Sequence, residues 1–299
     1  MALPLSFRPT GAFMTNSSSR KPVSIVLLLL VIAVAVLGWL QLRSPESAPP
    51  VAASAPPVPE VAAGGSVEPA TRHPVEALAP LLESQGVQDA LAEMPSVVEP
   101  APELGNSDVL MLSVLERLVG ADGLGQFIVR DFVRRIVVTV DNLPGERLPL
   151  ARSPVQLAPG NFLVSGDDGE RHIAADNAAR YAGYLTLAER IDSARLVAAY
   201  ARLYPLFQAA YDELGYPDAY FNDRLVAVID HMLAAPAAEE PIRVVQPKIR
   251  YQFAAPELEA RSAGHKIMLR IGADNAQRVK AKLGEIRGLL VGTTMPGVR

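Results

Sequence analysis

The chain has 299 residues, of which 49% are hydrophobic and 20% are charged, so it carries enough apolar material for one or two folded domains. It contains no cysteine, which excludes disulfide bonds, thiolate catalysis and cysteine-ligated zinc. The formal net charge is −4, and residues 1–42 carry three cations and no acid, so the rest of the chain is more acidic still. Because affinity for nucleic acid comes mainly from cationic side chains that contact phosphates, we expect no nucleic-acid partner.

Residues 23–42 have the composition of a transmembrane helix. The run from Val23 to Leu40 carries no charge, and only a serine and a glycine in it are not apolar. At ~1.5 Å per residue this run covers about 27 Å, close to the ~30 Å hydrocarbon core of a bilayer. Three cations precede the run and a single arginine follows it directly, so the positive-inside rule predicts a cytoplasmic tail at residues 1–22.

A cleaved signal peptide is the alternative interpretation of this segment. Ala33, Val34 and Ala35 fit the small-x-small cleavage pattern, but they lie inside an apolar run that is longer than the usual signal-peptide core. We therefore expect a single-pass protein of the bacterial inner membrane, with its N-terminus in the cytoplasm and its C-terminal domain in the periplasm.

Residues 43–102 are predicted to be a disordered linker rich in proline and alanine. Eight prolines lie within residues 44–74, which have almost no large apolar side chains. Such a composition cannot bury enough surface to offset the entropy of ordering the chain. Within the linker, apolar spacing predicts a short helix at residues 74–93.

The folded domain is predicted to span residues 103–291, followed by a disordered tail at 292–299. Ser107 and Asp108 are typical helix N-caps, and helical spacing follows them and recurs over residues 129–140. Prolines then favour irregular structure, and residues 161–173 favour a short hairpin. Further helices are expected at about 175–189, 192–204, 205–214, 218–234 and 273–291, with one or two extended segments at 242–253. The fold class is therefore mainly α with a small β element.

Two segments of the domain share the pattern I-x-A-D-N-A-x-R. They are IAADNAAR at residues 173–180 and IGADNAQR at residues 271–278, and each opens a predicted helix. Asp and Asn cap free amide groups at helix starts, which is a sufficient reason for the likeness. A true internal duplication is the alternative.

Three longer runs resemble the bacterial family catalogued as domain of unknown function 3014. They are RRIVVTVDNLPGERLPL, LYPLFQAAYDELGYPDAYFNDRLVAVIDHMLAAP and HKIMLRIGADNAQRVKAKLGEIRGLL. The resemblance covers roughly residues 103–291 and implies a single-span envelope protein with a proline- and alanine-rich spacer. It implies no activity, substrate or catalytic residue.

The sequence gives little support to catalysis, and we assign no catalytic residue, metal ligand or cofactor. It has no G-x-S-x-G motif, and its four histidines lack metal-ligand spacing. Asp223 and Asp230 lie on one face of the helix expected at 218–234, about 10.5 Å apart along its axis, with His231 beside them. This separation is long for a pair of glycosidase carboxylates, and surface ion pairing is the simpler interpretation.

Aromatic residues concentrate in the same region, where seven of the eight tyrosines lie between residues 181 and 220. A helical aromatic stripe usually belongs to a core, but tyrosine hydroxyls need hydrogen-bond partners when they are buried. The cluster is therefore either a core whose hydroxyl groups bond to polar side chains or a groove whose edge is open to solvent. The candidate binding residues are Tyr204, Tyr211, Tyr216, Tyr220, Phe221, Asn222, Asp223 and Arg224.

These observations favour a non-enzymatic envelope protein that binds or scaffolds another envelope protein or a cell-wall glycan. A glycan hydrolase that uses Asp223 and Asp230 is one alternative. A helical adaptor of a membrane complex is another.

Overall fold

The structure is a computed structural model that describes residues 71–92 and 102–291. Within these residues the chain is mainly helical and has two small two-stranded hairpins, which confirms the expected fold class of the C-terminal region. No helix in the described ranges is both long and apolar enough to cross a bilayer. The expected transmembrane helix at 23–42 and the expected tail at 292–299 lie outside those ranges.

The described helices fall into long ones that form the body and short ones that connect or cover them. The longer helices are α4 (Asp108–Val119), α6 (Phe132–Asn142), α8 (Ser193–Glu213), α9 (Phe221–Leu233) and α12 (Ala273–Leu290). The shorter α-helices are α2 (Ala79–Leu82), α3 (Gln85–Ala92), α5 (Ala121–Leu124), α7 (Ala182–Glu189), α10 (Pro256–Glu259) and α11 (Ala263–Arg270). The 3₁₀ segments are η1 (Val75–Leu78), η2 (Leu104–Asn106), η3 (Leu150–Arg152) and η4 (Ala175–Tyr181).

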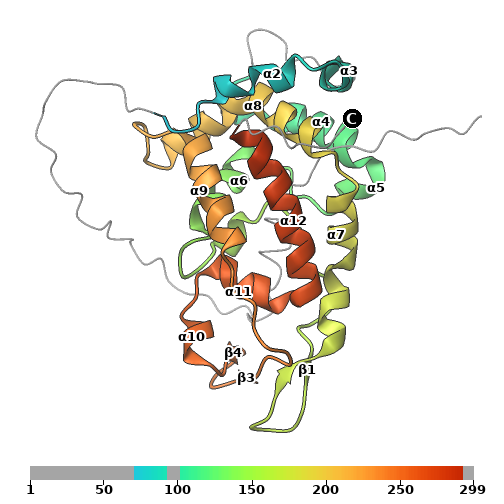
Figure 1. The fold of residues 1–299 in the computed structure, drawn as a ribbon, viewed down its shortest axis with the longest axis vertical. Helices are drawn as coiled ribbons and strands as arrows, with labels where there is room; N and C mark the ends of the chain where they lie inside the picture. The colour runs from blue at the N-terminus through green and yellow to red at the C-terminus, as the bar shows by residue number, and fades with distance from the viewer. Residues whose placement is uncertain (1–70, 93–101, 292–299) are drawn as a thin grey trace, which may run out of the picture.

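The centre of the domain is built from α6, α8, α9 and α12, which pack against one another. Figure 1 shows α12 between α9 and α7, with α8 crossing at one end. The apolar side chains of α6 recur at helical spacing, and Phe132, Ile136 and Val140 are all fully buried. Helical packing therefore overrides the preference of the β-branched residues in this segment for strands.

The start of α6 is held by a residue that we expected to cap a different helix. The Asp108 carboxylate accepts hydrogen bonds from the backbone N–H groups of Asp131 and Phe132, at 2.9 and 3.2 Å. Asp131 has the left-handed backbone with φ 55°, which turns the chain into α6. A carboxylate at this end also complements the positive end of the helix dipole.

The prediction of two helices meeting at Pro205 is wrong, because α8 runs without a break from Ser193 to Glu213. Proline removes one backbone hydrogen bond from a helix and crowds the preceding turn. Here Leu203, Leu206 and Phe207 on either side of the proline are all buried in the same core, so packing maintains the helix.

Residues 71–92, which we expected to lie within the linker with a short helix at 74–93, pack against the domain. They form η1, α2 and α3, and all three contact α8. Leu78 and Val87 are the buried side chains of this segment. Figure 1 shows these elements lying across α8, so the folded body includes them.

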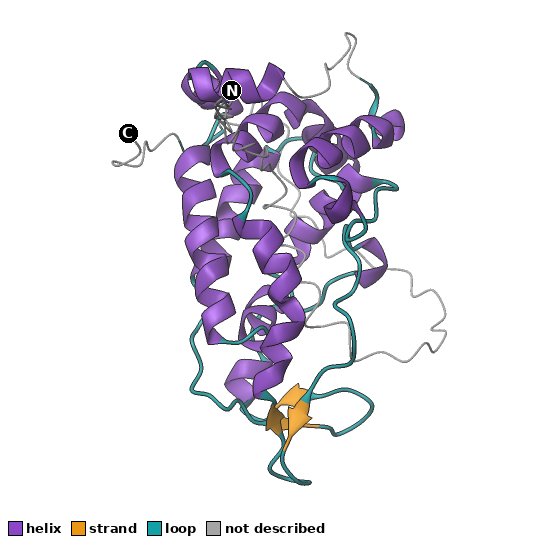
Figure 2. Ribbon diagram, turned by 90° about the vertical axis from the view of Figure 1, so that its right-hand side faces the viewer, coloured by secondary structure: helices purple, strands orange, loops and turns teal. Residues whose placement is uncertain are grey.

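The strands form a small patch at the opposite end of the molecule, drawn in orange in Figure 2. One hairpin pairs β1 (Val164–Ser165) with β2 (His172–Ile173), and the other pairs β3 (Val244–Val245) with β4 (Gln252–Phe253). A bridge between His172 and Arg243 joins the two hairpins. The expected hairpin and the expected extended segments therefore lie side by side.

Candidate functional site

The aromatic stretch forms a core where α8 meets α9. Phe221 is completely buried, and its ring lies near three rings of α8 at centroid distances of 5.6–6.4 Å. Those rings belong to Tyr200, Phe207 and Tyr211, and each of these three is also buried. Phe221 and Tyr211 are thus buried side chains of this core.

Tyr204 is half-buried and contributes to the same junction. Its hydroxyl donates to the Gln208 side-chain oxygen at 2.7 Å, and that oxygen also accepts from the backbone N–H of Phe221 at 2.9 Å. The Gln208 amide nitrogen in turn donates to the carbonyl of Ala219 and to Asp212. Gln208 therefore links α8 to the start of α9, a role that the sequence did not indicate.

Asn222 and Asp223 hold the first described residues of the chain. The buried Asn222 side chain donates to the carbonyl of His73 at 2.7 Å and accepts from the Tyr200 hydroxyl at 3.2 Å. The Asp223 carboxylate accepts from the backbone N–H groups of Arg72 and His73, the latter at 2.7 Å, and from the hydroxyl of Thr71. A carboxylate that accepts several N–H bonds is well satisfied, so this pair fastens residues 71–73 to α9.

A surface depression of about 410 Å³ lies beside this attachment. Its walls include Arg72 and His73 from the attached segment, Asp218 and Tyr220 from the turn before α9, and Asp223 from α9 itself. The structure thus brings several candidate residues together around one hollow.

Tyrosine side chains border the depression. Tyr211 lines it, and Tyr216 stacks on Tyr211 with ring centroids 4.7 Å apart while 43% of its own surface stays exposed. Burial raises the pKa of Tyr211 to about 12. The accessible aromatic edge of the cluster is therefore made mainly by Tyr216 and Tyr220.

The two carboxylates considered for catalysis both have partners. Asp223 is engaged as described above, and Asp230 forms a bidentate ion pair with Arg287 of α12. Arg224 donates to the Asp141 carboxylate at 2.8 Å and to the Asp141 carbonyl at 2.7 Å. The structure provides structural roles for all three charged groups, and no group of metal-ligating side chains occurs among residues 71–92 and 102–291.

His231 lies at the end of α9 next to a second histidine. Its ring stacks on that of His265, with centroids 4.0 Å apart, and its Nε2 lies 2.7 Å from the Ser262 hydroxyl. Burial lowers the pKa of His231, and the charges of His265 and Arg224 lower it further.

We predict that replacing Asp223 by alanine loosens residues 71–83 without unfolding the core. The backbone N–H groups of Arg72 and His73 lose a charged acceptor, and the free energy that keeps this segment docked falls by about 1–3 kcal/mol. Hydrogen exchange followed by mass spectrometry should show faster exchange there and unchanged exchange in α6. Asp218→Ala, on the wall of the same depression, is the matched control, and equal exchange in the two variants would contradict the assigned role.

We predict that the protein loses stability when the pH falls from 7.5 to 5.5, in part through His231. Because folding lowers the pKa of His231, the unfolded chain takes up this proton more readily than the folded one. The contribution is complete above the ordinary histidine pKa of ~6.5 and is lost as the pH falls toward the lower folded-state value. Urea denaturation at both pH values should show a smaller difference for His231→Gln than for wild type or His172→Gln. An undiminished difference in His231→Gln would refute this assignment.

The comparisons with known proteins give a family and nothing more specific. No match to this chain was found among curated proteins or among solved structures. The family DUF3014, described as "Protein of unknown function", matches residues 132–287, which is more than half of the chain and includes α6, α8, α9, α11 and most of α12. The chain belongs to the DUF3014 family.

Proposed function

We propose that this protein is a single-pass inner-membrane protein whose helical domain is a binding module in the periplasm. The depression beside Tyr216 and Tyr220 is its binding surface, and a cell-wall glycan is the ligand that we favour. An envelope protein that presents an extended peptide is the second ligand class. The observation that carries this proposal is an exposed tyrosine edge next to a polar hollow of about 410 Å³.

Binding is favoured over hydrolysis because the two candidate acids are occupied. A glycosidase needs one carboxylic acid to protonate the leaving group and a second carboxylate to act on the sugar or on water. Asp223 is surrounded by backbone donors, and Asp230 is paired with Arg287. Both carboxylates are thus held by other groups of the protein, so a hydrolase is the weaker proposal.

The chemistry of the hollow suits a ligand with many hydroxyl groups. Tyrosine faces offer flat apolar surface, and their hydroxyls offer hydrogen bonds at its edge. Asp218 and Arg72 add an acceptor and a donor on the same rim. Because Arg72 belongs to the segment held by Asp223, a ligand in the hollow contacts both that segment and α9.

We predict that the full chain in detergent cosediments with purified cell wall and that Tyr216→Ala combined with Tyr220→Ala weakens this binding about tenfold. The expected loss corresponds to stacking and hydrogen-bond contacts of ~1.4 kcal/mol in total. Ile249→Ala, which removes an exposed apolar side chain in the other half of the domain, should bind like wild type.

Two results of this experiment would overturn the proposal. Wild type that stays in the supernatant and instead crosslinks to integral membrane proteins would favour an adaptor. Soluble wall fragments released by wild type but not by Asp230→Asn would favour a hydrolase.

The proposed topology predicts the behaviour of fusions at the C-terminus. Alkaline phosphatase, which is active only in the periplasm, should be active when fused after Arg299, and a cytoplasmic reporter fused there should be inactive. Deleting residues 23–42 should reverse this pattern. The opposite activities in the intact chain would place the domain in the cytoplasm and remove the cell wall as its ligand.

A further inference from the structure

The two I-x-A-D-N-A-x-R segments contact each other through matching asparagines. The Asn177 side chain donates to the carbonyl of Arg270 at 2.9 Å, and the Asn275 side chain donates to the carbonyl of Ala178 at 3.0 Å. In both segments the asparagine oxygen also accepts from the arginine three residues later. The asparagines therefore join the two segments to each other, and we find no side-chain cap from the expected helix starts in η4 or α12.

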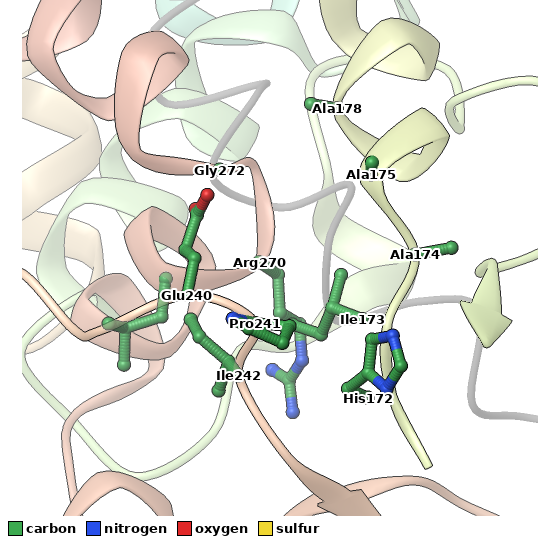
Figure 3. A pocket seen from close by; sticks show the side chains of 11 residues that line it. His172, Ile173, Ala174, Ala175, Ala178, Glu240, Pro241, Ile242, Arg270 and Gly272 are labelled. Atoms are coloured by element: carbon green, nitrogen blue, oxygen red, sulfur yellow. The ribbon is translucent and has the colours of Figure 1, made fainter. Parts of the chain in front are cut away.

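A cavity of about 320 Å³ lies at this junction, and Figure 3 shows its lining. Its rim contains the exposed residues Ala175, Glu240 and Pro241, whereas Ile242, Leu269 and Arg270 are buried and form its floor. The volume is about ten times the ~30 Å³ that one water molecule occupies in the liquid, and it lies at the small end of the range for ligand pockets.

Arg270 is the outstanding group in this cavity. Only 4% of its surface is exposed, and its Nη1 has no hydrogen-bond partner among the described residues. In Figure 3 its side chain extends between Ile242 on one side and Ile173 on the other. Its guanidinium also lies 4.8 Å from the centre of the Phe253 ring. Buried charges in proteins are ordinarily paired and hydrogen-bonded, so a guanidinium with an orphaned donor indicates a site for an anion.

Nearby acidic groups do not fill this role. Glu259 is the carboxylate that acts most strongly on Arg270, but its oxygens accept from the backbone of Phe253 and contact Lys266. Glu240, on the rim, accepts from the backbone N–H of Ala273. Burial lowers the pKa of Arg270 to about 10, which still leaves it charged at neutral pH.

A second orphaned polar atom lies close to this charge. The Tyr181 hydroxyl is fully buried and has no hydrogen-bond partner of good geometry among the described residues. Burial raises the pKa of Tyr181, and the neighbouring charge of Arg180, followed by that of Arg270, lowers it in part. The Arg270 Nη1 and the Tyr181 hydroxyl are thus two buried polar atoms without a hydrogen-bond partner of good geometry among the described residues.

We propose that this cavity binds the carboxylate group of a small organic acid, with Arg270 as its ion-pair partner. A guanidinium matches a carboxylate with two parallel hydrogen bonds. Ile173, Ile242 and Leu269 receive the apolar body of the acid. The carboxylate of Glu240 on the rim disfavours anions with two or more charges, such as phosphate. This site is separate from the depression beside α9 and does not depend on the function proposed for it.

Calorimetric titration of the full chain in detergent tests this proposal with matched probes. Sodium butyrate represents a free acid, and N-acetyl-alanyl-alanine represents the carboxyl end of a peptide. Butyramide and the dipeptide amide have the same shapes without the charge, and sodium phosphate is the multiply charged probe. Wild type should bind at least one carboxylate about tenfold or more tightly than its amide. Whichever carboxylate binds identifies the source as a free acid or a chain terminus.

Two variants assign the binding to this cavity. Arg270→Met should weaken carboxylate binding at least ~tenfold, because it removes the charged partner. Ala175→Leu keeps Arg270 but narrows the rim of the cavity, so it should also abolish carboxylate binding. If Arg270→Met fails to fold, Ala175→Leu shows whether the acid binds in this cavity. Arg152→Met, an exposed arginine far along the chain, should bind like wild type.

Each of the following results would overturn the proposal. Failure of both carboxylates to bind would mean that the cavity holds water only. Equal binding of a carboxylate and its amide, or tighter binding of phosphate, would show that the chemistry is wrong. Unchanged binding in folded Arg270→Met or Ala175→Leu would place the acid elsewhere.

Discussion

The packing of Phe221 against three aromatic rings of α8 determines how the α8–α9 half of the domain is arranged. A ring of this size buried from all sides fixes both the position and the rotation of the first turn of α9. The next two residues, Asn222 and Asp223, consequently face residues 71–73 and hold them. The depression that we propose as a binding surface lies beside this attachment, so its shape depends on a hydrophobic contact that never meets solvent.

Much of the fold could be predicted because it is encoded locally. Helical spacing of apolar residues marked α4, α6, α9 and α12, and turn residues marked the hairpin of β1 and β2, whereas β3 and β4 were expected only as extended segments. The break predicted at Pro205 was wrong. Proline disfavours a helix locally, but the side chains before and after it are buried in the core, and their packing maintains the helix. Local preference decides such a position only where packing does not.

The polar part of the candidate site was harder to predict, because its partners are distant in the sequence. Asp223 bonds to backbone groups about 150 residues away, and any residue could supply those N–H groups. Composition therefore marked residues 71–73 as linker and could not reveal that they dock on α9. The sequence did place Tyr216, Tyr220 and Asp223 near one another, because they lie within eight positions of the chain.

The repeated I-x-A-D-N-A-x-R pattern reflects a contact between the two segments, which the interpretation as two helix caps did not anticipate. Asn275 donates to a carbonyl within the first segment, and Asn177 donates to the carbonyl of Arg270 directly before the second, so the shared asparagine serves the same purpose in both copies. Arg270 lies buried at this junction and lines the cavity there. Shared sequence between two segments of one chain can thus indicate that they touch.

The attachment of residues 71–73 to α9 has a mechanical consequence. Tension that travels along the polypeptide from its N-terminal side arrives first at the hydrogen bonds of Asp223 and then at the side chain of Leu78. Residues 71–92 pack on α8, α9 and α12 through these contacts, whereas those helices and α6 also pack on one another, so we expect this segment to detach before the centre opens. Their release would lengthen the extended chain on the N-terminal side of the domain by roughly 75 Å.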